Sequence, residues 1–82
     1  MKVLKFYAEW CGPCNMLSMS IKDAAIKAEL VEVDIDKDNV MAAKYGVRGV
    51  PLCVVVDDEG KELRRKVGVM TKEQFEQFVN IG

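Results

Sequence analysis

The sequence predicts an α/β fold, and three observations point to that class. Residues 2–8 are a short apolar run, and apolar residues at helical spacing follow them. Residues 30–35 then alternate apolar and acidic side chains, so the first part reads as strand, helix and parallel strand. Residues 52–56 form a continuous apolar run, as expected for a strand covered on both faces. With a charged strand and a last helix, the expected order is βαβ, short helix, ββα.

The first helix is expected to run for about four turns from Cys14. Its apolar stripe consists of residues at spacings of three and four, Leu17, Ile21, Ala24 and Ala28. Three further apolar residues lie beyond this stripe, Met16, Met19 and Ile26. We expect them to pack in the core, where such residues are usually found; the alternative is a partly apolar exposed surface.

The second half of the chain contains clear signals for element ends. Asp36 or Asp38 can cap a short helix that reaches about Tyr45, and Gly46 suits the left-handed residue that ends it. Residues 57–60 read as a turn, and residues 62–67 as a charged strand at a sheet edge, antiparallel to its neighbour. The last helix has the capping-box pair Thr71 and Gln74 and the apolar face Phe75, Phe78 and Val79.

Composition predicts one soluble domain over residues 1–82, with room for a single site. Half of the residues are apolar and the net charge is −1, which disfavours a disordered chain, a membrane protein or a nucleic-acid partner. Residues 1–2 lead into the first strand without the pattern of a secretory signal, so we expect a cytoplasmic protein. Three cysteines, an odd number, do not suggest a structural disulfide framework.

A CxxC motif, Cys11-Gly12-Pro13-Cys14, lies between the first strand and the first helix. Residues at i and i+3 on a helix have Cβ atoms about 5–6 Å apart, and a disulfide needs roughly 3.5–4.5 Å. A tightened first turn could therefore make or break the bond, which indicates a redox switch. In a reducing compartment such a pair is catalytic or binds a metal. A closed zinc site would need an unusual ligand here, because the chain has no histidine.

Three blocks in this chain resemble the thioredoxin family: residues 8–14 (AEWCGPC), 45–51 (YGVRGVP) and 66–69 (KVGV). The resemblance covers nearly the whole chain, which lacks the strand and helix that usually precede this region and so has the size of a glutaredoxin. It implies a minimal thioredoxin fold, a four-stranded mixed sheet with the second strand outermost, then the first, third and fourth. Glutaredoxins usually have Pro-Tyr between the cysteines, so the Gly-Pro pair favours thioredoxin despite the length.

The resemblance also implies roles for the cysteine pair and its surroundings. Cys11 would be the exposed nucleophile, because amides at a helix start favour the thiolate, and Cys14 the buried thiol that resolves the mixed disulfide. Pro51 resembles the family's cis-proline, which frees the Val50 backbone to bond an extended substrate; the alternative is a trans-proline opening a strand. Substrate contacts are expected at Trp10, Gly12, Pro13, Gly49, Val50, Pro51 and Gly68, with Trp10 covering the site or, alternatively, lying in the core. No metal or organic cofactor is needed.

The chain departs from the family at two positions. Thioredoxins usually have a buried aspartate six residues before the first cysteine and a lysine in the next parallel strand, and this chain has Lys5 and Glu32 there. We expect a partly buried Lys5–Glu32 pair beneath Cys14 that favours the Cys14 thiolate, with Glu32 able to relay a proton. The alternative is that Lys5 reaches water and Glu32 is solvated. Cys53 is expected to be a buried strand thiol.

The predicted function is reduction of protein disulfides by a monomer that exchanges electrons with a thioredoxin-reductase-like donor. Two alternatives stay open at this point. One is a glutaredoxin-like enzyme that uses glutathione. The other is a binding module that docks partners on the surface around Trp10, Val50 and Gly68 without redox turnover.

Overall fold

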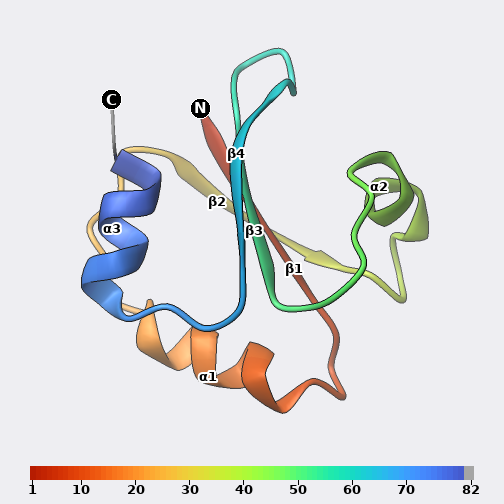
Figure 1. Ribbon diagram of the computed structural model, residues 1–82, viewed down its shortest axis with the longest axis horizontal. Coiled ribbons are helices and arrows are strands. Elements are labelled where there is room, and N and C mark those ends of the chain that lie inside the picture. The colour runs from red at the N-terminus through yellow and green to blue at the C-terminus, as the bar shows by residue number, and fades with distance from the viewer. Residues whose placement is uncertain (81–82) are drawn as a thin grey trace.

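A computed structural model describes residues 1–80 of the chain. Its elements are β1 (Lys2–Tyr7), α1 (Gly12–Ser20), β2 (Glu29–Asp34), α2 (Asn39–Lys44), β3 (Leu52–Val56), β4 (Glu62–Val67) and α3 (Lys72–Asn80) (Figure 1). They form one four-stranded sheet in the order β2-β1-β3-β4. β1 is parallel to β2, and β3 is antiparallel to both β1 and β4. The predicted fold class and strand order are confirmed.

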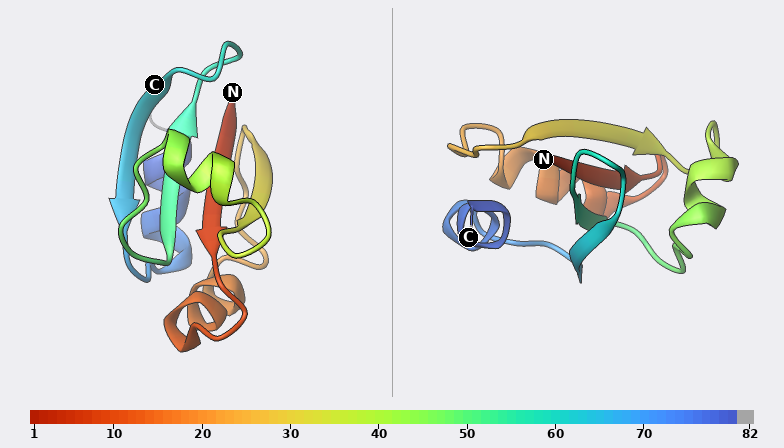
Figure 2. Two further views of the ribbon diagram at one scale, coloured as in Figure 1. Left: turned by 90° about the vertical axis from the view of Figure 1, so that its right-hand side faces the viewer. Right: turned by 90° about the horizontal axis from the view of Figure 1, so that it is seen from above.

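Helices cover both faces of the sheet: α1 and α3 lie on one face and α2 on the other (Figure 2). Side chains along β1 alternate between the two faces of the sheet. Val3 packs with residues of α1 and α3, while Leu4 and Phe6 pack on the side of α2. All five residues of β3 are buried, as its apolar run predicts. The centre of the sheet is therefore covered on both sides.

The first helix is shorter than predicted. α1 ends at Ser20, and the Ile21 N–H closes its last turn by donating to the Leu17 carbonyl. Met16 and Met19 are 62% and 80% exposed, so the expectation that they pack in the core is wrong. The periodic stripe misled because the apolar residues after Ile21 reach the core from a loop.

That loop has one turn of its own, in which the Ala24 N–H donates to the Ile21 carbonyl at 3.1 Å, and its other bonds go to side chains of α3. The Glu76 carboxylate accepts from the Ala25 N–H at 2.7 Å. The Asn80 side chain accepts from the Lys27 N–H at 2.8 Å and donates to the Ala25 carbonyl at 2.9 Å. Because these side chains satisfy the backbone, the segment has no need of helical hydrogen bonds. Ala24, Ile26 and Ala28 still pack against the core.

The remaining element ends follow the predicted signals. Asp38 caps α2 by accepting from the Met41 N–H, and Gly46 has a φ of 61° just after that helix. Thr71 and Gln74 form both hydrogen bonds of a capping box at the start of α3. β4 lies at the sheet edge, as its charges suggest. Among residues 1–80, no helix has the length and apolar character needed to cross a membrane.

Candidate redox site

Cys11 and Cys14 are joined by a disulfide at the N-terminus of α1. Their Cα atoms are 5.2 Å apart, a separation imposed by the first helical turn. Cys11 is the N-cap residue, with extended backbone, and its Sγ accepts from the Cys14 N–H at 3.1 Å. Pro13 occupies the first turn, where its missing N–H leaves no bond unmade. The sulfur of Cys11 thus lies where helix amides favour negative charge.

Both cysteines are buried in this oxidised form. Cys11 is 5% exposed and Cys14 is 2% exposed, so the expectation of an exposed Cys11 is wrong for the disulfide. The two residues form a small apolar cluster with Ala8, and Val50 packs against it. Of the two residues, Cys11 has the slightly larger exposed fraction.

The loop before β3 lies beside the disulfide. The Val50–Pro51 peptide bond is cis, the geometry expected from the sequence, and the Val50 carbonyl oxygen is 3.8 Å from Cys11 Sγ. The Gly68 N–H donates to the Pro51 carbonyl at 2.9 Å, and Gly68 has a φ of +101°, which favours glycine. A Cβ added to Gly49 would meet nothing within 4 Å, so space alone does not require glycine there. Segments distant in sequence therefore meet beside the Cys11 sulfur.

Trp10 is not a core aromatic. Its side chain is 71% exposed, and its indole N–H donates to the Asp36 carboxylate at 2.9 Å. The Asp36 N–H in turn donates to the Asp34 carboxylate at 2.9 Å, which fixes the loop after β2. Sequence reasoning did not find Asp36 as a partner of Trp10, because only the parallel pairing of β1 with β2 brings the two loops together.

Lys5 and Glu32 form the predicted pair. The Lys5 ammonium donates to the Glu32 carboxylate at 2.9 Å, with Lys5 2% exposed and the Glu32 side chain 56% exposed. The ammonium also donates to the Ser18 hydroxyl on α1 and lies 5.4 Å from the centre of the Tyr7 ring. Sequence reasoning missed Ser18. The available signal was its position four residues after Cys14, on the helix face that carries Leu17 and Ile21 toward the sheet.

Cys53 is the register partner of Lys5 on the other neighbouring strand and is fully buried. Burial raises the pKa of the Cys53 thiol to about 11, although the nearby Lys5 charge acts in the opposite direction. Cys53 is thus the buried strand thiol that the sequence predicts, and at neutral pH it is protonated. Within residues 1–80, no three side chains of the His, Cys, Asp and Glu types gather as a metal site would require.

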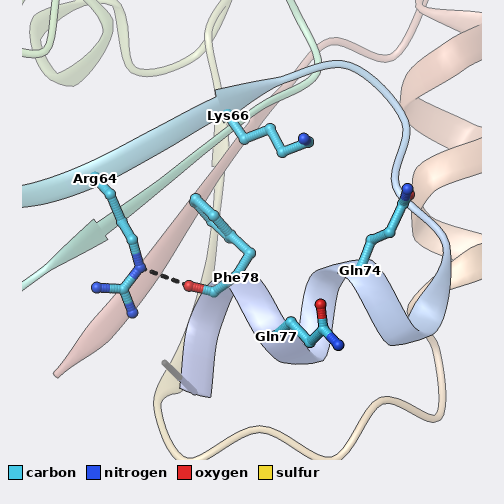
Figure 3. A pocket seen from close by; sticks show the side chains of 5 residues that line it. All are labelled: Arg64, Lys66, Gln74, Gln77 and Phe78. Atoms are coloured by element: carbon cyan, nitrogen blue, oxygen red, sulfur yellow. Dashed lines mark hydrogen bonds between the residues drawn. The ribbon is translucent and has the colours of Figure 1, made fainter. Parts of the chain in front are cut away.

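A cleft of about 320 Å³ lies away from the disulfide, between β4 and α3. Its lining residues are Arg64, Lys66, Gln74, Gln77 and Phe78 (Figure 3). Arg64 donates to the carbonyls of Phe78 and Val79 at 2.6 and 2.9 Å, so its guanidinium caps the C-terminal end of α3. This cation has a structural role, and we place the functional site at the cysteines.

Comparison with known proteins gives consistent matches to thioredoxins. The family model described as Thioredoxin matches residues 1–81. The thioredoxin of Bacillus subtilis is 34% identical over 92% of this chain and 75% of its own length, and that of Chlamydia caviae is 36% identical over 95% and 78%. Among solved structures, a mutant thioredoxin from Halobacterium salinarum superposes with a TM-score of 0.85, with 32% identity over 95% of this chain and 70% of its own. The Schistosoma mansoni thioredoxin pre-protein gives 0.83, with 29% identity over 95% and 74%.

Proposed function

Since this chain belongs to the thioredoxin family and its redox-active cysteines are paired, it is a thiol–disulfide oxidoreductase, and we propose how its residues divide the reaction. In the reduced enzyme the Cys11 thiolate attacks one sulfur of a substrate disulfide. A mixed disulfide forms and the first substrate thiolate leaves. Cys14 then loses its proton and attacks the Cys11 sulfur, which releases the second substrate thiolate and forms the Cys11–Cys14 disulfide. Two electrons pass to the substrate.

The observation that carries the assignment of Cys11 is its place at the helix start. Its sulfur accepts from the Cys14 N–H and lies beside the Val50 carbonyl, and the residue as a whole is 5% exposed against 2% for Cys14. Cys14 is inside the first turn, further from solvent. The groove residues proposed to hold an extended substrate are those named from the sequence, Trp10, Gly12, Pro13, Gly49, Val50, Pro51 and Gly68, with the Val50 backbone pairing to the substrate strand.

Lys5 and Glu32 are proposed to act on the second step. The Lys5 ammonium bonds Ser18, one turn beyond Cys14, so its charge favours the Cys14 thiolate. Glu32 joins this buried ammonium to solvent and can take up a proton. If the pair takes part, Lys5→Met and Glu32→Gln will change the pH profile of disulfide reduction, with Glu29→Gln on the same strand as the control. Unchanged profiles in both variants would remove the pair from the mechanism.

Family membership implies disulfide-containing substrates and a reductase partner. We propose protein disulfides as substrates, a flavoprotein thioredoxin reductase as the donor, and a monomer acting in the cytoplasm. The unpaired Cys53 thiol fits a reducing compartment. Insulin reduction tests the function: turnover should occur with a thioredoxin reductase and NADPH and should stop in Cys11→Ser. Turnover with glutathione alone would instead favour the glutaredoxin-like alternative. A biological role that survives loss of both cysteines would favour the binding module.

A further inference from the structure

Ser18 is a polar residue on the buried side of α1. Cys14, Leu17 and Ile21 on the same side are all buried, and Ser18 lies one turn after Cys14. Residues four apart on a helix have Cβ atoms about 5–6 Å apart, so the hydroxyl is close to the resolving cysteine. A serine in a helix interior has no intrinsic advantage there. Its side chain accepts from the Lys5 ammonium instead.

The structure places the Lys5 ammonium against α1, and an outer cleft offers it an alternative place. A cleft of about 180 Å³ opens beside it and is lined by Lys5, Ser18, Ile21, Lys22, Leu30 and Glu32. Because the Glu32 side chain is 56% exposed, a lysine bonded to Glu32 alone could follow it outward, away from α1. The bond to Ser18 opposes that movement, since it ties the same ammonium to the helix.

The other ionisable groups around Lys5 do not direct its charge to the helix. Glu32 on β2 draws the ammonium toward solvent, and Lys22 on α1 has the same charge sign and lines the outer cleft. Tyr7 on β1 presents its ring, and Cys53 on β3 is a buried thiol. We propose, building on the proposed role of Lys5, that Ser18 is a positioning residue, whose hydroxyl holds the Lys5 ammonium against the face of α1 that carries Cys14 and thereby favours the Cys14 thiolate.

The test is a thiolate titration of Cys14, followed by ultraviolet absorbance. Cys53 is also a buried thiol, with its pKa raised to about 11, so the titration is carried out in a Cys11→Ser, Cys53→Ala background in which Cys14 is the one remaining thiol. Ser18→Ala should raise the midpoint of the Cys14 titration by about 0.5–1 pH unit. Alanine is favourable in helices, so the fold should be retained. Ser18→Thr, which keeps the hydroxyl, should restore the wild-type midpoint.

Ser20→Ala is the matched control, because Ser20 is on the same helix but donates to the Met70 carbonyl at 2.7 Å. It should leave the Cys14 midpoint unchanged; an equal shift in Ser20→Ala would assign the effect to α1 in general and overturn the proposal. If Lys5→Met shifts the midpoint and Ser18→Ala does not, the positioning role of Ser18 is wrong while the role of Lys5 stands. If neither variant shifts it, both roles fail. Insulin reduction separately reports whether the cysteine pair functions.

Discussion

Lys5 and Glu32 form an ion pair across the two parallel strands of the sheet, with one partner 2% exposed and the other 56% exposed. The pair is asymmetric: the buried ammonium depends on its partners, whereas the carboxylate can be solvated without it. Removing the lysine therefore leaves no buried charge uncompensated, whereas removing the carboxylate charge leaves the buried ammonium with the Ser18 hydroxyl but without a counter-charge. Substitutions of the two residues should therefore have different effects on the free energy of unfolding.

We expect Glu32→Gln to lower the free energy of unfolding by about 1 kcal/mol, a value reduced from that of a fully buried pair because Glu32 is half exposed. Lys5→Met, which keeps an unbranched chain, should be neutral or slightly stabilising. Urea unfolding of the oxidised protein measures both. Glu29→Gln, at an exposed position of the same strand, is the control and should change stability by less than about 0.5 kcal/mol. Equal losses in the two pair variants would contradict the asymmetry.

The buried thiol of Cys53 predicts an alkaline loss of stability. Its pKa rises from an ordinary value of 9.0 to about 11 in the folded protein, chiefly through burial. The folded state therefore holds the Cys53 proton more tightly than the unfolded state does. The resulting contribution to the free energy of unfolding is complete below pH 9 and disappears as the pH rises to about 11. Its size is about 2–3 kcal/mol.

Urea unfolding of the oxidised protein at a series of pH values, in wild type and Cys53→Ala, isolates this contribution. Other groups titrate in the same range, but they are common to both proteins. The free energy of unfolding of the alanine variant should fall less steeply above pH 9. The smaller side chain also lowers stability, but by the same amount at every pH. Parallel curves for the two proteins would show that Cys53 does not hold its proton in the fold.

We expect the hydrogen bond from Trp10 to Asp36 to fix the orientation of the exposed indole ring. Asp36→Ala should leave the ring free to rotate. Losing a hydrogen bond worth about 1 kcal/mol in binding free energy should raise KM for a protein disulfide about fivefold, with little change in kcat. The chain has a single tryptophan, so its fluorescence anisotropy should fall in parallel. Asp36→Asn, which keeps an acceptor, serves as the control. A change in kcat alone would place Trp10 in the chemical step instead.

Much of this fold could be predicted because its local signals agree with one another. The fully apolar run at Leu52–Val56 and the caps at Asp38 and Thr71 each specify a local structure that the tertiary contacts retain. The cysteine pair and the cis-proline loop could also be predicted, since their motifs are short and contiguous in the sequence. The partners Ser18 and Asp36 could not be found in this way. Their roles come from tertiary structure: α1 packs on β1 and brings Ser18 to Lys5, and the pairing of β1 with β2 brings Asp36 to Trp10.

The end of α1 shows the limit of periodicity. Apolar spacing continued to Ala28, yet the helix stopped at Ser20, because a later element supplies the hydrogen bonds of the following loop. Glu76 and Asn80 are about fifty residues away in sequence, as their contacts with Ala25 and Lys27 show. A pattern confined to one segment contains no information about such partners.

Asn80 should therefore stabilise the loop as well as α3. Its side chain joins the Lys27 N–H and the Ala25 carbonyl, so Asn80→Ala should lower the free energy of unfolding by about 1–2 kcal/mol. Amide exchange at Lys27 should become about tenfold faster, because its acceptor is removed. Gln77→Ala, at an exposed position of the same helix, separates this effect from a change in helix propensity and should leave exchange at Lys27 unaltered. Unchanged exchange at Lys27 in Asn80→Ala would mean that the loop keeps its conformation without the side-chain bonds.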